Sequence, residues 1–116
     1  MDSAQTWGRI NGEQRKHNRY KLEAPIIFSW RDAMHALHRS VGLTSVLSTH
    51  GAFVLTADPP PVEASVELKV FLPRVGAGVP MRFLGRGKVI RVEAVEHPHA
   101  RAGFAVEAKA FVLRKG

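Results

Sequence analysis

The sequence contains no cysteine. This absence excludes disulfide bonds, thiolate nucleophiles and cysteine-ligated zinc or iron–sulfur sites. No apolar run approaches the roughly 20 residues that a membrane-spanning helix needs. The first residues also lack the basic and then apolar regions of a signal peptide. We therefore expect a cytoplasmic protein without a membrane span.

Acidic residues are few, with 10 Asp and Glu against 17 Lys and Arg, which gives a net charge of +7 with His neutral. A surface of this sign prefers anions, so mononucleotides, nucleic acids and lipid headgroups all stay open as partners. The 116 residues fit one domain, and 45% hydrophobic residues are enough for a core.

Long amphipathic helices are also missing from the sequence. Residues 65–72 instead alternate apolar and polar side chains, which is the period of a half-buried strand. Glycine and proline separate several such segments, and Gly85 and Gly87 predict a bend or bulge. The predicted strands are 26–30, 51–56, 65–72, 81–92 and a last one from 103 toward 113.

These short strands predict an all-β fold, a small antiparallel β-barrel of the split-barrel type with little helix. Residues 32–40 stay ambiguous, since their apolar spacing fits a short helix and a hairpin equally. Residues 1–24 are polar and carry little apolar periodicity, so we expect a flexible N-terminal arm. The barrel is then expected to span residues 25–116.

No residues point to catalysis or to a metal site. Two histidine pairs, His35 with His38 and His97 with His99, have no carboxylate nearby at ligand spacing, so we interpret them as exposed loop histidines. The carboxylates are scattered, and no pair suggests acid–base chemistry. We therefore expect a protein that is not an enzyme and that needs no cofactor or metal.

Two short motifs suggest a binding function. Arg15 and Arg19 lie four residues apart just before the first predicted strand, and Ser48 and Gly51 lie three apart at the entry to another. With the order of the later strands, this combination resembles the PilZ domain family, bacterial receptors for the second messenger cyclic di-GMP. That family carries RxxxR in an N-terminal arm and [D/N]xSxxG at a barrel strand. Alone, Ser48 and Gly51 would equally fit a simple turn.

The resemblance, which covers about residues 13–108, implies a cyclic di-GMP site. Arg15 and Arg19, with Lys16 between them, would close over the ligand, while Ser48 and Gly51 would lie beneath it. The sequence departs from the family at Val46, where the motif has Asp or Asn. Valine cannot accept hydrogen bonds from the guanine edge, so the resemblance implies reduced affinity, with water, Thr44 or Ser45 as partial substitutes. A downstream protein partner is also expected.

Two other functions stay open. A barrel of this family that has lost the nucleotide could act as a protein-interaction adaptor, which Val46 favours and the intact RxxxR disfavours. Nucleic-acid binding ranks last, because single-strand binders usually carry several aromatic side chains on one face and Phe83 is the only aromatic among the basic residues concerned. Those basic residues are Arg74, Arg82, Arg86, Lys88 and Arg91.

Overall fold

The computed structural model describes residues 19–21, 23–73 and 78–115, and the regular elements in these ranges are all strands. They contain no helix, and so none that could cross a membrane. The strands are β1 (Arg19–Lys21), β2 (Pro25–Arg31), β3 (Leu37–Ser48), β4 (Gly51–Thr56), β5 (Ser65–Leu72), β6 (Met81–His97) and β7 (Ala100–Lys115).

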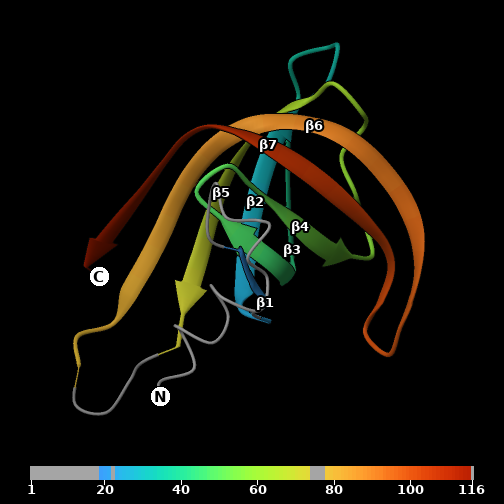
Figure 1. The fold of residues 1–116 in the computed structure, drawn as a ribbon. Coiled ribbons are helices and arrows are strands. Elements are labelled where there is room, and N and C mark those ends of the chain that lie inside the picture. The colour runs from blue at the N-terminus through green and yellow to red at the C-terminus, as the bar shows by residue number, and fades with distance from the viewer. Residues whose placement is uncertain (1–18, 22, 74–77, 116) are drawn as a thin grey trace.

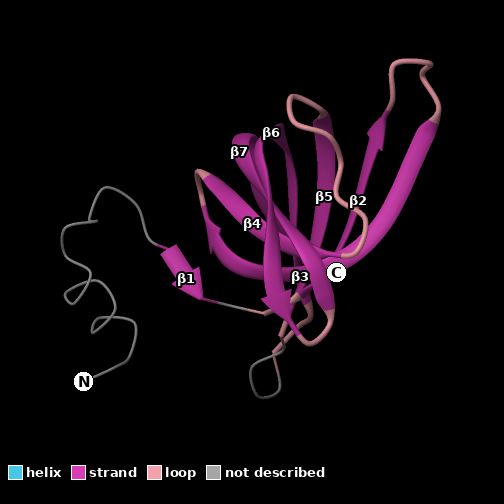
Figure 2. Ribbon diagram, turned by 90° about the vertical axis from the view of Figure 1, so that its right-hand side faces the viewer, coloured by secondary structure: helices cyan, strands magenta, loops and turns pink. Residues whose placement is uncertain are grey.

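Strands β2 to β7 form a closed, six-stranded antiparallel barrel. Around the wall the order is β3-β2-β5-β6-β7-β4, and β4 pairs back with β3 to close it. The short strand β1 adds to the same edge of β3 as β2, and Figure 2 shows it at the periphery of the other strands. In Figure 1, β6 and β7 arch over the barrel as one long curved hairpin. The predicted all-β antiparallel barrel is thus confirmed.

The ambiguous segment 32–40 forms a hairpin turn and the start of β3. Asp32 builds the turn, because its Oδ1 accepts hydrogen bonds from the amides of Met34 (2.8 Å) and Ala36 (3.0 Å). His35 has a φ of 65°, a left-handed conformation that no regular helix contains. The helix alternative is therefore wrong for this segment, and the hairpin alternative is confirmed.

The predicted irregularity near Gly85 and Gly87 is a β-bulge. The register between β6 and β7 shifts between Arg86 and Gly87, so that Lys109 is the extra residue on β7. A bulge of this kind increases the local twist of a strand pair. It lies where the β6–β7 hairpin continues past the closed part of the barrel wall.

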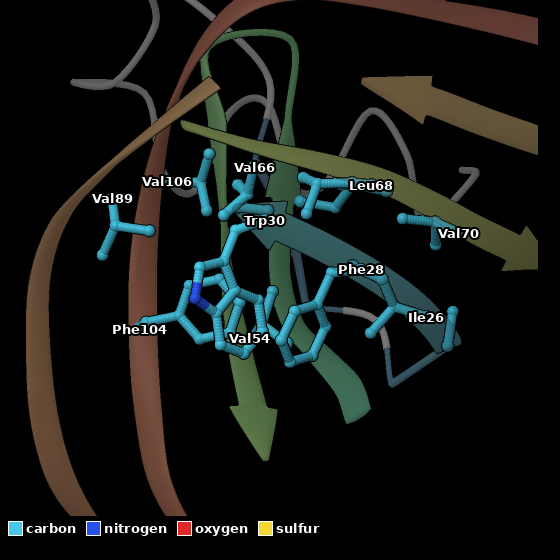
Figure 3. Packing of buried hydrophobic residues seen from close by; sticks show 13 residues of the cluster. Ile26, Phe28, Trp30, Val54, Val66, Leu68, Val70, Val89, Phe104 and Val106 are labelled. Carbon is cyan, nitrogen blue, oxygen red and sulfur yellow. The ribbon is translucent and has the colours of Figure 1, made fainter. Parts of the chain in front are cut away.

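The core lies inside the barrel and draws on all six wall strands (Figure 3). Phe28 of β2 and Phe104 of β7 meet edge to face at its centre, with ring centroids 4.9 Å apart. Both rings are fully buried, and such aromatic pairs add stabilisation beyond the area they bury. The alternate buried positions of β2 and β5 supply much of the rest. This core holds the strand register on which the candidate site depends.

Candidate functional site

Strand pairing brings the end of the first motif beside the second motif. Arg19, the first residue of β1, lies opposite Ser48, the last residue of β3, and Ser48 lies opposite Gly51 of β4. Lys21 lies opposite Val46 in the same pairing. Two segments almost thirty residues apart in sequence thus share one patch of sheet. The two other predicted arm residues, Arg15 and Lys16, lie outside the described residues.

Ser48 shapes the turn between β3 and β4. Its Oγ accepts a hydrogen bond from the amide of His50 at 3.1 Å and donates to the carbonyl of Gly51 at 3.4 Å. The side chain is nearly buried, so its hydroxyl already serves the local backbone. The residue therefore has the turn role that its sequence spacing left open.

Gly51 is required by the packing of β4 against β7. It lies opposite Glu107, and a Cβ at this position would fall on the carbonyl oxygen of Val106. A larger residue would therefore push the two strands apart just where β4 begins. The family resemblance places this glycine beneath a ligand, whereas the structure supplies a reason for it within the barrel itself.

Val46 lies half-buried on the outer surface of the barrel beside an aromatic ring. It pairs with Phe53 of β4, whose neighbours Ala52 and Val54 point into the core, so Phe53 points outward. The guanidinium of Arg91 lies over that ring, 5.7 Å from its centroid. An apolar and aromatic surface therefore adjoins the Arg19–Ser48 pair. Phe53 was not among the predicted site residues, because the apolar run of β4 does not show from the sequence which side chains point outward.

Thr44 anchors the connection between β1 and β2. The residue is completely buried, and its Oγ1 accepts a hydrogen bond from the amide of Ala24 at 3.0 Å. Its own amide donates to the Ala24 carbonyl at 2.9 Å. Thr44 is therefore committed to the barrel and cannot replace the acceptor missing at Val46. Ser45, which the register skips between Thr44 and Val46, is the bulged residue and lies half-buried.

A row of charges continues the site across the barrel wall. Glu107 lies between Gly51 on one side and Lys88 on the other. Lys88 also pairs with Glu63 at 2.7 Å, and this hydrogen bond and ion pair raise the pKa of Lys88 above its usual value. Both partners of that pair are largely exposed, so it contributes little to stability. The contact with Glu63 does orient the Lys88 side chain, whose backbone lies opposite Glu107.

One histidine of each pair contacts a carboxylate. For His38 the carboxylate is in the adjoining turn, and for His97 it is in a distant part of the sequence. His38 contacts Asp32 at 2.8 Å and stacks on Trp30, while His97 contacts Glu23 at 3.2 Å. The hydrogen bond from His38 is the largest of the effects that lower the pKa of Asp32. Within the described ranges, no three His, Asp or Glu side chains gather as a metal site would require.

No protein-family model, no curated protein and no solved structure matches this chain. The likeness to PilZ domains therefore rests on the two motifs and the order of the strands. The geometry adds that Arg19 of the first motif and Gly51 of the second lie on either side of Ser48, at the end of β3.

Proposed function

We propose that this protein is a cyclic di-GMP-binding effector or adaptor domain of the PilZ type, acting in bacterial second-messenger signalling. The observation that carries the proposal is the register of Arg19 opposite Ser48 at the β3–β4 turn. That register brings Arg19 of the first motif beside Ser48 of the second, which the sequence spacing alone does not require. A short motif match at two unrelated places on the barrel would have argued against a shared ligand.

The residue types suit this ligand. Cyclic di-GMP presents two phosphates and two guanines, and arginine carries a permanent charge and a planar fork of donors. One guanidinium can therefore bridge phosphate oxygens, pair with guanine O6 and N7, or stack on a purine face. Arg15 and Arg19 fill these roles in the proposal, and Lys16 adds a third positive charge to the same arm.

The affinity should be reduced by Val46. A guanine donor left without an acceptor in the bound state costs about 1–3 kcal/mol, which is roughly ten- to a hundredfold in affinity. Each bidentate arginine contact contributes a similar amount. Two arginines retained against one acceptor lost leave a site that is weakened and still functional.

Binding would act by closing the arm over the barrel. The ligand would hold Arg15 and Arg19 against the surface near Ser48, and so change what the domain presents to another protein. A downstream protein partner is therefore part of the proposal. No catalytic step is involved, since binding alone changes the surface.

Isothermal titration calorimetry tests the proposal. The full chain should release or absorb measurable heat with cyclic di-GMP at micromolar concentrations, and Arg19→Ala should weaken binding at least tenfold. Arg39→Ala removes an equal charge from an exposed position on the far half of β3, and should leave binding unchanged. Silent titrations up to high micromolar ligand, or equal binding by Arg19→Ala, would reject the proposal.

A nucleotide-independent adaptor is the second candidate. It is favoured by the apolar outer surface that Val46 and Phe53 form beside the motif residues, because such a surface suits a protein contact. Silent calorimetry together with a partner whose capture depends on Val46 would select it. A substitution such as Val46→Asp would then abolish capture without unfolding the barrel.

A further inference from the structure

The C-terminal part of β7 extends beyond the closed barrel wall and has a partner strand on one side only among the described residues. β4 pairs with β7 only between Ala102 and Glu107, and the last link is the amide of Ala108, which donates to the carbonyl of His50 at 2.8 Å. From Lys109 to Lys115, β7 pairs with β6 alone among the described strands. We call this stretch the β7 free edge. Figure 1 shows it running out beside β6 to the C-terminal end of the chain.

The β7 free edge offers backbone groups and apolar side chains together. In a strand paired on one side only, the N–H and C=O groups of every second residue point away from the sheet. Val112 is 48% exposed on one face of the strand and Leu113 is 56% exposed on the other. Phe111 shares the face of Leu113 and packs edge to face on Phe83. An edge of this kind can accept an added strand, with the backbone supplying affinity and the side chains supplying specificity.

The charge around the edge is of one sign. The segments 81–87 and 108–115 together contain five cations and no acid, and none of the five takes part in an ion pair among the described residues. Because like charges repel at short range, this surface favours an acidic partner and disfavours a basic one. The five cations are Arg82, Arg86, Lys109, Arg114 and Lys115.

The same charges argue against a second copy of this chain. An antiparallel pairing of the edge with itself, centred on Val112, would place Lys109 opposite Lys115 at both ends. Like charges directly across a strand pair destabilise it. Positive residues at the ends of an exposed edge are a known means of preventing self-association. The edge is therefore built to accept a strand of a different composition.

We propose that the β7 free edge binds an extended, acidic segment of a partner protein, which adds to the sheet as an antiparallel strand beyond β7. Apolar residues of that segment lie against Val112 and Leu113, and its carboxylates face the lysines and Arg114. The proposal does not depend on nucleotide binding. The edge begins beside the β3–β4 turn, since Ala108 contacts His50, so a partner here would also lie next to the proposed nucleotide site.

A peptide titration followed by NMR tests this directly. The probe is a synthetic eight-residue peptide in which valine alternates with threonine and glutamate occupies both ends; the comparison peptide carries lysine in place of glutamate. With the acidic peptide, we expect every second amide between Ala110 and Lys115 to gain protection from hydrogen exchange. Arg114→Glu should weaken binding at least tenfold. Arg101→Glu makes the same charge change at an exposed position at the far end of β7, and should bind as the wild type does.

Several results would overturn the proposal. Equal binding of the two peptides would mean that no charge selection exists, and shifts without alternating protection would mean that no strand is added. Concentration-dependent dimers in analytical ultracentrifugation, with the edge amides already protected, would assign the edge to a second copy. Oligothymidine that shifts the same amides while the acidic peptide does not would assign it to single-stranded nucleic acid.

Discussion

Arg19 and Ser48 lie opposite each other in the three-residue antiparallel pairing that joins β1 to β3. This register places β1 beside the turn between β3 and β4. Backbone pairing sets the position of Arg19 opposite Ser48, so this position does not depend on what the Arg19 side chain contacts. Substitutions at neighbouring positions can therefore be compared on the same backbone arrangement.

Val46→Asn should strengthen cyclic di-GMP binding. Asparagine restores the acceptor that the family motif has at this position, and an acceptor for a guanine donor contributes about 1–3 kcal/mol. We expect the dissociation constant measured by calorimetry to fall about ten- to a hundredfold. Val46 lies half-buried on the outer face, so the polar side chain keeps access to water in the free protein.

The matched control is Val41→Asn, on the same strand and 65% exposed. It introduces the same side chain at a position that pairs with Ile27 of β2, away from the motif residues. Its affinity for the nucleotide should equal that of the wild type. Improvement in both variants would show that the gain does not come from the position of the acceptor.

Thr44→Val should destabilise the barrel. Valine has nearly the shape of threonine, but it leaves the amide of Ala24 without its buried acceptor. An unsatisfied buried donor costs about 1–3 kcal/mol, and urea unfolding should show a loss in that range. Thr49→Val, in the exposed β3–β4 turn, removes a hydroxyl from the surface and should change stability by less than about 0.5 kcal/mol.

Gly51→Ala should destabilise the barrel even without ligand. The added methyl group would meet the carbonyl oxygen of Val106, so β4 and β7 must move apart or the turn must shift. Overpacking of this kind typically costs about 1–3 kcal/mol. His50→Ala, one position earlier in the exposed turn, is the comparison. Unchanged thermal stability of Gly51→Ala would show that the glycine serves the ligand and not the fold.

The sequence predicted the strands that show a clear local pattern. β5 repeats apolar and polar residues without interruption, and β2 and β4 are short apolar runs between turn residues, so their positions were predicted closely. β3 was missed as a strand. Its first half, with Leu37 and Val41 exposed, has no buried face, and a bulge near Ser45 breaks the alternation of its second half.

For the candidate site, the sequence predicted the residues of two motifs but not their arrangement in space. Their residue types suggested the ligand, but the position of Arg19 beside Ser48 depends on a pairing between β1 and β3 that no local pattern reveals. The sequence likewise did not predict that Asp32 contacts His38 or that Glu23 contacts His97. Glu23 meets His97 only because the long β6–β7 hairpin curves back across the barrel to the β1–β2 connection.

Asp32→Asn should remove part of the acid sensitivity of the barrel. Hydrogen bonds from His38 and from the amides of the turn hold the pKa of Asp32 below its usual value near 4. The ionised carboxylate therefore stabilises the folded state above the pKa of the unfolded chain, and that contribution is lost as the pH falls through the lower folded pKa. Asparagine keeps one acceptor oxygen for the turn but carries no charge.

Thermal unfolding of both proteins between pH 2 and 7 measures the effect. The wild type should be the more stable of the two at pH 5 to 7, and the difference should shrink as the pH falls through the lowered pKa of the folded protein, because the wild-type carboxyl is then protonated. Asp58→Asn removes an equal charge from an exposed loop and measures the effect of net charge alone. A difference between wild type and Asp32→Asn that is constant with pH would mean that the ionisation of Asp32 contributes nothing to the hairpin.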